Sequence, residues 1–516
     1  MSEEYQFLTP QEAWASLVDY RTKYYKQYGA AYSGNRRALR ETGAIGSFWR
    51  RGGKTKMHVE LAGDIAATSA DLLFAEEPIF EIEHEQDDTL RPEAEAALLP
   101  RQARLDQLIA DNGLHGKLNE GAESCAMLGD VFIKLNWWPD ELDFPVLSIV
   151  QGDSAWAEYV LGQLQCIHFF SVARYDPQSG KYVRAYERYE KGRITMAMFL
   201  GSEGDLGADM GDEALAKYGF EREITCPVDE MCAVHIPNMR PNRKFRDSPN
   251  GRSDLDGLRD QLDALDEAYT SWMRDVRLAK ARLIIPAEYL RRKPSDLFSG
   301  DRQFTYEFDE DVETMVALDI NPQDGSGNPI TASQFAIRAD EFMKTCSDLI
   351  RNIVSEAGYS PQSFGLDING NAQSGTALKI REKKSFNTRN KKQTYWRAPL
   401  ETILTTMVHL DAALYPGEGS LADDAVTMTF SDTMSSDIST MATAIRDLNS
   451  AMALSTDLKV QMLHPDWTQK QIIDEVQRIK EENGLSTSPI PELGDFHTPI
   501  DQTTNEDQGQ EQGGES

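Results

Sequence analysis

The chain has 516 residues, and its 84 acidic residues outnumber 53 basic ones, which gives a formal net charge of −31. This balance excludes a general nucleic-acid binder, because contacts to phosphate depend on Lys and Arg. Hydrophobic residues make up 40% of the chain, enough for a substantial core, and the mean hydropathy of −0.51 is typical of a soluble protein. At this length we expect two to four domains, or one elongated body with extensions.

No segment reaches the roughly 18 apolar residues that a membrane span needs, and the first residues lack a signal-peptide pattern. We therefore expect synthesis in the cytosol, and use there or in something assembled there. Five scattered cysteines argue against a disulfide framework. Cys226, Cys232 and His235 form the closest cluster, but their spacing is too long for a zinc site and a fourth ligand is missing. We predict no metal and no cofactor.

The first half of the chain mixes helical and strand patterns, which predicts an α+β body over residues 1–250. The predicted helices cover residues 11–30, 64–78 and 92–128. The predicted strands cover residues 54–61, 79–85, 130–138, 146–151, 165–175 and 182–201. A loop rich in Gly and Asp is expected at 201–215.

Residues 253–283 carry large apolar side chains at an average step of 3.5, which predicts a helical rod roughly 48 Å long. Ser253 is the expected N-cap, with Asp254 and Asp256 in the first turn. A second apolar stripe runs over 335–353, and a β-like insert separates the two. The pattern fits a hairpin-like stalk with a tip, and it fits equally an ordinary helical pair inside one core.

A segment rich in Gly, Asn and Ser at 358–375 is expected to be a mobile loop. Behind it, residues 374–397 predict a helix that concentrates eight Lys or Arg in an otherwise acidic chain. Pro399 should interrupt this helix, because proline removes a hydrogen bond and clashes with the preceding turn. The continuation should bury one apolar face, made by Leu400, Ile403, Met407, Leu410 and Leu414.

The last part of the chain predicts one strand at 425–432 and two helices at 436–454 and 467–483. Residues 486–516 have almost no large apolar side chains, so we expect them to be disordered.

Motifs that would indicate catalysis are missing from the sequence. Gly53, Lys54 and Thr55 end like a phosphate-binding loop, but Phe48 stands where that loop needs a glycine. An acidic run at 309–313 could bind a divalent metal, as in a nuclease, but a solvated surface explains it better. We therefore predict that the protein is not an enzyme.

Three blocks, 64–82, 251–290 and 360–400, together resemble portal proteins of tailed double-stranded DNA bacteriophages of the siphovirus type. Taken in order they span about two-thirds of the chain. The resemblance implies a portal fold and a ring, usually of twelve copies, at a unique capsid vertex of the virion. It assigns the parts as follows: 1–250 wing, 251–285 first stem helix, 286–331 clip, 332–356 second stem helix, 357–373 tunnel loop, 374–435 long kinked wing helix and strand, 436–485 helical crown, and 486–516 tail.

The resemblance also implies partners, namely phage DNA in the channel, the terminase large subunit, a head-completion or adaptor protein, and the major capsid and scaffolding proteins. We expect the channel surface at Asp367, Asn369, Asn371, Gln373, Lys379, Lys383 and Lys384. We expect contacts between subunits at Leu262, Tyr269, Trp272, Phe342, Arg389, Lys391, Lys392 and Arg397. The alternatives are a metal-dependent nuclease and another capsid assembly or scaffold-type protein.

Overall fold

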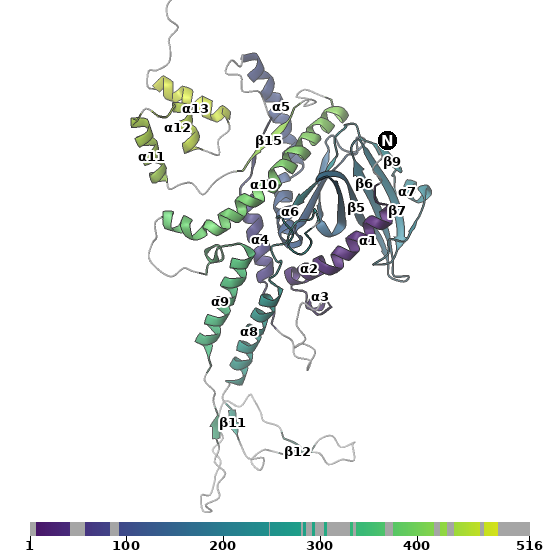
Figure 1. Cartoon of the computed structure of the whole chain (residues 1–516), viewed down its shortest axis with the longest axis vertical. Coiled ribbons are helices and arrows are strands. Elements are labelled where there is room, and N and C mark those ends of the chain that lie inside the picture. The colour runs from purple at the N-terminus through teal and green to yellow at the C-terminus, as the bar shows by residue number, and fades with distance from the viewer. Residues whose placement is uncertain are drawn as a thin grey trace, which may run out of the picture. The chain divides into compact units, whose positions relative to one another are not determined.

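The computed structural model describes residues 7–41, 57–82, 92–246, 248–279, 282–284, 292–294, 304–306, 331–333, 337–366, 375–416, 424–430, 438–451, 453–464 and 469–482. The chain divides into two compact units, Met1–Thr433 and Met434–Ser516 (Figure 1). Helices and antiparallel sheets are mixed in the first unit, while the described part of the second is helical. The mixed α+β character expected from the sequence is confirmed.

Two sheets form the centre of the first unit. One has the strand order β10-β2-β3, and the other has the order β4-β5-β6-β7-β8, with β9 also paired to β7. Every pairing is antiparallel. Their bounds are β2 Asp130–Asn136, β3 Val146–Gln151, β4 Ala155–Val160, β5 Gln163–Asp176, β6 Lys181–Glu190, β7 Arg193–Gly201, β8 Ala208–Asp209, β9 Glu223–Thr225 and β10 Ala233–Pro237.

Helices cover these sheets, and a further strand pair joins distant parts of the chain. Strand β1 (Ile79–Ile82) pairs with β15 (Val426–Thr429), so two segments far apart in the sequence lie side by side. The helices are α1 Pro10–Tyr20, α2 Lys26–Ser33, α3 Arg36–Glu41, α4 Leu61–Phe74, α5 Pro92–Asp111, α6 Leu114–Leu128 and α7 Asp212–Lys217, with a π-helical turn at Arg21–Tyr25 and short 3₁₀ turns at Gly152–Ser154 and Pro361–Phe364.

Local chemistry explains where the first helix begins. Thr9 caps α1 by accepting a hydrogen bond from the backbone of Glu12, whose carboxylate bonds back to Thr9. This reciprocal pair satisfies amides that the first helical turn leaves without partners. The strand predicted at 54–61 is wrong in its described part, because Leu61 begins α4.

Two helices, α8 (Arg259–Leu278) and α9 (Ala339–Ala357), lie side by side and project from the body of the first unit (Figure 1). They run antiparallel, since Gln261 bonds to Glu356 near one end and Asp275 pairs with Arg338 at 2.7 Å near the other. The two rods predicted from periodicity are therefore present and form a pair.

The predicted start of the first rod is wrong. Helix α8 begins six residues after Ser253, and its N-cap is Leu258, which makes no side-chain cap. Ser253 Oγ instead donates to the Met127 carbonyl at 2.5 Å and accepts from the Leu255 amide at 3.0 Å. Ser253, which we expected to cap the helix, therefore holds a tight turn against α6.

Four short strands are described between α8 and α9. Strand β11 (Arg282–Ile284) pairs with β14 (Thr331–Ser333), and β12 (Arg292–Pro294) pairs with β13 (Phe304–Tyr306). The β11–β14 pair closes the segment that connects the two helices. Most of the predicted clip, 286–331, lies outside the described residues.

Helix α10 (Gly375–Leu414) is a single element of 40 residues that passes through Pro399. The interruption expected at this proline does not occur. Proline lacks an amide hydrogen and costs one backbone hydrogen bond, but the helix on its C-terminal side is held by a large apolar face. Leu400, Ile403 and Met407 are buried in the core of the first unit, together with Leu404, Val408 and Leu410.

The second unit contains α11 (Ile438–Ser450), α12 (Thr456–Leu463) and α13 (Gln469–Glu482). Its core consists of Val460, Ile472 and Val476, with Ile479 packed against them. The two predicted helices are present, and α12 is an additional helix that the prediction missed. The tail from 486 lies outside the described residues. Among the helices described in the whole chain, we find none with the length and hydropathy of a membrane span.

Candidate functional site

The α8–α9 pair has an apolar seam that the described part of the chain covers only in part. Near the body, Leu262 and Ile353 are buried. Farther out, the rings of Trp272 and Phe342 stack with centroids 6.3 Å apart and planes 6° from parallel, and both side chains are only partly buried. Tyr269 packs beside Trp272 with centroids 5.9 Å apart.

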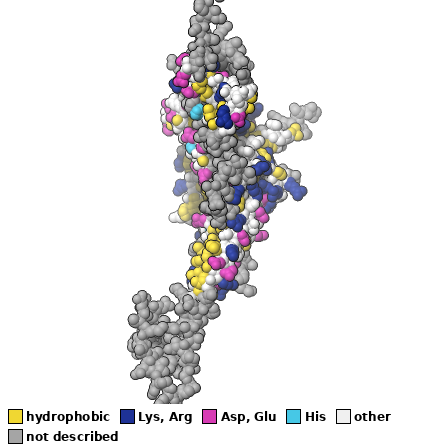
Figure 2. Space-filling model, turned by 90° about the vertical axis from the view of Figure 1, so that its left-hand side faces the viewer, with side chains coloured by type: hydrophobic (Ala, Val, Ile, Leu, Met, Phe, Trp, Pro, Cys, Tyr) yellow, Lys and Arg dark blue, Asp and Glu magenta, His cyan; other side chains and the backbone are white. Residues whose placement is uncertain are grey.

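Several apolar side chains on the same pair are open to solvent. Val276 is 39% exposed and Met343 is 52% exposed. Figure 2 shows hydrophobic side chains gathered in a band along these helices. An exposed apolar strip of this kind usually marks a contact with another molecule. Of the residues predicted to lie between subunits, Tyr269, Trp272 and Phe342 are thus accessible, whereas Leu262 already packs inside the chain.

The basic stretch of α10 does not present one uniform face. Lys383, Lys391 and Arg397 are exposed, and Arg389 is half-buried. The Arg397 guanidinium lies 6.0 Å from the centroid of the Phe430 ring, at the limit of a cation–π contact. The described part of the chain does not include Asp367, Asn369, Asn371, Gln373 or the side chain of Lys379.

Lys392 corrects the prediction that it pairs with a neighbouring subunit. Its side chain is 1% exposed, and its Nζ lies 2.5 Å from Asp254 Oδ2 in the same chain. The amine also donates to Ser69 Oγ at 2.6 Å and to the Tyr359 hydroxyl at 3.0 Å. A charge buried this deeply needs partners, and the chain supplies all of them. Lys392 is therefore unavailable to another copy.

Polar side chains on the same face of α10 hold the segment that follows α9. Lys384 bonds to the backbone carbonyl and, at 2.8 Å, to the hydroxyl of Ser355. Ser385 Oγ accepts from the Ser360 amide at 2.8 Å, and Thr388 Oγ1 donates to the Gly358 carbonyl at 2.6 Å. Lys384 thus neutralises the negative end of α9, where a cation is favoured.

Gly358 is required at this junction for two reasons. Its φ is +105°, a backbone conformation that other residues rarely adopt, and a Cβ at this position would lie 3.0 Å from Thr388 Oγ1. Gly358 is the left-handed C-cap of α9, so this helix ends one residue after 356, the end expected for the second stem helix.

Sequence reasoning missed the partners of Lys392. Asp254 was assigned to the first turn of a helix, Ser69 to a helix without a partner, and Tyr359 to the mobile loop expected at 358–375. The first residues of that segment are instead packed against α10, since Tyr359 and Ser360 are at most 2% exposed and Pro361–Phe364 form a 3₁₀ turn. Burial and the nearby Asp254 carboxylate raise the pKa of Tyr359 well above its usual range, so this hydroxyl stays protonated and donates to Asp254 at 2.6 Å. No local motif signals such a cluster, because its members are far apart in the sequence.

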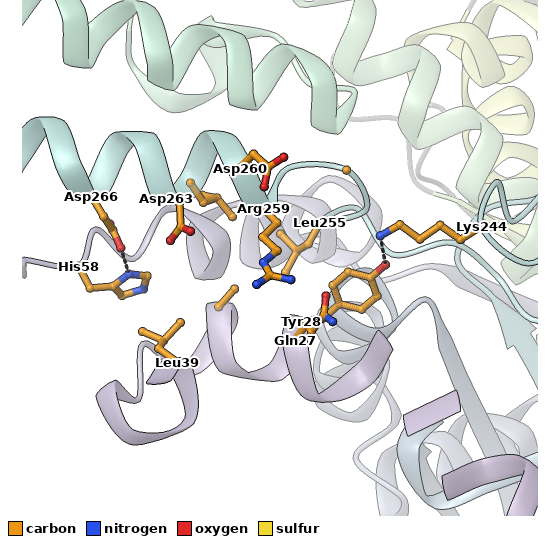
Figure 3. A pocket seen from close by; sticks show the side chains of 13 residues that line it. Gln27, Tyr28, Leu39, His58, Lys244, Leu255, Arg259, Asp260, Asp263 and Asp266 are labelled. Atoms are coloured by element: carbon orange, nitrogen blue, oxygen red, sulfur yellow. Dashed lines mark hydrogen bonds and ion pairs between the residues drawn. The ribbon is translucent and has the colours of Figure 1, made fainter. Parts of the chain in front are cut away.

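A cavity of about 260 Å³ lies at the root of α8, between that helix and α2 and α3 (Figure 3). Its rim is charged, and the charges are largely paired: His58 Nδ1 lies 2.8 Å from Asp266, and Lys244 bonds to Asp256 at 2.6 Å and to Tyr28 at 3.3 Å. The hydrogen bond to Asp266 raises the pKa of His58. We find no nucleophile with an adjacent base among the residues that line this cavity.

Three potential metal ligands, Glu158, Cys166 and His168, are buried together in the six-stranded sheet. His168 Nε2 lies 2.5 Å from Glu158 Oε1 and 3.4 Å from Cys166 Sγ, while Nδ1 bonds to Tyr186 at 2.8 Å. Two ligands on one tetrahedral zinc ion stand about 3.3 Å apart or more, and a structural site has four. The set fits a hydrogen-bonded pair better than a metal site.

The sequence was compared with models of known protein families. The family model for phage portal proteins of the SPP1 Gp6-like type matches residues 20–486. The chain belongs to this family. The match includes α8, α9 and α10, so the paired helices and the basic helix are parts of a portal-family chain.

Solved structures offer distant similarities to this portal-family chain. One is described as the neck of a native GTA particle computed with C12 symmetry, and it has 12% identity, a TM-score of 0.39, and coverage of 78% of this chain and 89% of that chain. Another, the neck of an empty GTA particle computed with C6 symmetry, has 12% identity and a TM-score of 0.38, with 78% and 90% covered. The comparison with curated proteins returns no match.

Proposed function

We propose that this portal-family chain assembles into a ring, usually of twelve copies, and that DNA is packaged and ejected through the central channel. The family match over residues 20–486 carries the proposal. The α8–α9 pair supports it, because its half-covered apolar seam needs a neighbouring molecule. A ring of identical copies supplies one neighbour on each side of every pair.

The parts of the ring follow the order of the chain. Residues 1–250 form most of the wing, α8 and α9 are the stem helices, and 286–331 is the clip between them. The tunnel loop is the later part of the expected segment 357–373, because Gly358, Tyr359 and Ser360 are bonded to α10. Helix α10 is the long helix that crosses the wing, 436–485 is the crown and 486–516 is the tail. Lys383 and Lys384, just behind the loop, then lie close to the channel.

Net charge supports a conduit that does not bind DNA tightly. Twelve copies at −31 each carry a formal charge of about −370. A mostly negative wall repels phosphate, and a few positive side chains near the loop steady the duplex. The Debye length is about 8 Å at physiological salt, so only charges at the narrowest point act on DNA.

The proposed partners are those of a vertex platform. The clip docks the terminase motor during packaging and the head-completion or adaptor protein afterwards, while the wing meets major capsid and scaffolding proteins. The ring is assembled in the host cytoplasm and becomes part of the virion. The chain acts as a structural channel without catalytic turnover.

Negative-stain microscopy of the purified protein tests this proposal. We expect top views of a ring with a central hole. A different capsid assembly protein would give particles without a hole, which would contradict the proposal. Incubation with plasmid DNA and Mg²⁺ tests the nuclease alternative, and we expect the plasmid to remain intact.

A further inference from the structure

The buried cluster around Lys392 connects four separate segments of the first unit. Lys392 belongs to α10, and Ser69 belongs to α4. Asp254 lies in the turn before α8, and Tyr359 directly follows α9. Each of the four residues is at most 3% exposed. The cluster thus stands where both helices of the projecting pair meet the long helix that crosses the body.

The hydrogen bonds of this cluster are complete. An ammonium group has three donors, and Lys392 uses them on Ser69, Asp254 and Tyr359. Asp254 Oδ2 also accepts from Tyr359 at 2.6 Å, and Asp254 Oδ1 accepts from Asn238 Nδ2 at 2.9 Å. Every interaction is directional, so the cluster is satisfied in one relative placement of the four segments.

Further bonds along α10 extend this attachment. Lys384, Thr388 and Lys392 are spaced by four residues and therefore share one face of the helix. The first two bond to Ser355 and Gly358 at the end of α9. The helix pair and α10 are consequently joined over about 12 Å, and rotation of one against the other would break several hydrogen bonds together.

We propose that Lys392 is a positioning residue that fixes the angle between the α8–α9 pair and α10, and thereby the number of copies in the ring. The inference rests on the proposed function, because it requires a ring. Each copy offers two separate surfaces to its neighbours, the apolar seam of the helix pair and the exposed basic side chains of α10. The angle between these surfaces sets the rotation from one copy to the next.

A buried ion pair is a costly way to fill a core, since apolar residues of similar volume are often as stable or more stable. Apolar packing is largely non-directional, whereas the Lys392 cluster specifies one geometry. A head-to-tail ring closes only when the rotation per copy divides a full turn, so a change of a few degrees selects another copy number. The need for one fixed angle between the helix pair and α10 explains why a charged side chain is buried at this junction.

The test compares Lys392→Met with Lys217→Met in the full-length protein. Lys217 is an exposed lysine at the end of α7 to which no contact between copies is assigned, so its variant removes the same charge and adds the same side chain without touching the cluster. Mass photometry and class averages in negative stain give the number of copies per ring. We expect Lys217→Met to keep the wild-type distribution, and Lys392→Met to give a broadened or shifted one while circular dichroism shows a folded protein.

A folded Lys392→Met protein with the wild-type ring mass would overturn the inference and leave the proposed function intact. Wild-type protein without rings would contradict the proposed function itself. If Lys392→Met fails to fold, Tyr359→Phe decides, because it removes the hydroxyl from the cluster and keeps the aromatic ring. We then expect a smaller change in ring mass, and an unchanged mass would overturn the inference.

Discussion

The α8–α9 pair and the C-terminal half of α10 have the same apolar periodicity but very different burial. On α10, Leu404 and Val408 are completely buried against the body of the first unit. On the projecting pair, Trp272 and Phe342 are only partly buried, and Met343 is 52% exposed. The apolar face of α10 is buried by other segments of the same chain when the protein folds. The α8 and α9 helices pack mainly against each other, so part of each apolar face stays uncovered. The difference separates residues that maintain the fold from apolar residues that remain exposed in the single chain.

The largest effect that this comparison predicts is on assembly. Trp272→Asp places a charge in the seam, where a neighbouring copy would have to bury it, so ring formation should be lost while the body stays folded. Size-exclusion chromatography with light scattering, together with circular dichroism, measures both. Ala264→Asp introduces the same charge at an exposed position of α8 and should form rings. Uniform rings from Trp272→Asp would contradict the role of the seam.

The second prediction concerns the stability of the fold and tests the buried apolar face of α10. Leu404→Ala should lower the free energy of unfolding of the first unit by about 2–5 kcal/mol, because it removes buried methyl groups and leaves a cavity. Chemical denaturation followed by tryptophan fluorescence measures the change. Asn390→Ala, at an exposed site on the same helix, should change stability by less than about 0.5 kcal/mol. A similar stability for both variants would show that this half of α10 is not a core helix.

A smaller effect is expected at the exposed basic end of α10. Lys383→Glu reverses a charge proposed to lie near the channel, so packaged DNA or phage titre should fall about tenfold without a change in the melting temperature. Lys344→Glu, an exposed reversal on α9, serves as the matched control. Normal packaging by Lys383→Glu would remove the proposed channel role of this lysine.

The smallest predicted effect is a pH dependence at the root of α8. Asp266 raises the pKa of His58 in the folded state, so their interaction stabilises the fold fully below about pH 6.5, the unfolded value of histidine. This contribution is lost as the pH rises through the higher folded pKa. The melting temperature of wild type should therefore exceed that of His58→Gln at about pH 6, and the gap should narrow at about pH 9. A constant gap would mean that His58 contributes through packing alone.

Periodicity predicted the helices well, because burial of an apolar stripe is a property of neighbouring residues in the sequence. The rods at 253–283 and 335–353 contain α8 and most of α9, and the apolar face after Pro399 lies in the core as expected. The proline did not end the helix, since tertiary packing on its C-terminal side compensates for one lost hydrogen bond.

Charge was a poorer guide than periodicity. Lys391 and Lys392 are adjacent and chemically identical, yet one is exposed and the other is 1% exposed beside Asp254. The partners of Lys392 lie 33 to 323 residues away in the chain, so only the assembled fold brings them together. Ser253 shows the same limit, because a good capping residue was used to anchor a turn.

Photo-cross-linking at the seam tests the central claim, that a neighbouring copy covers the α8–α9 pair. A photoreactive amino acid in place of Met343, which is 52% exposed, should give a ladder of covalent oligomers when assembled protein is irradiated. The same amino acid at the exposed Ala264 should give far fewer. Assembled rings that yield no cross-links between copies from position 343 would contradict the account.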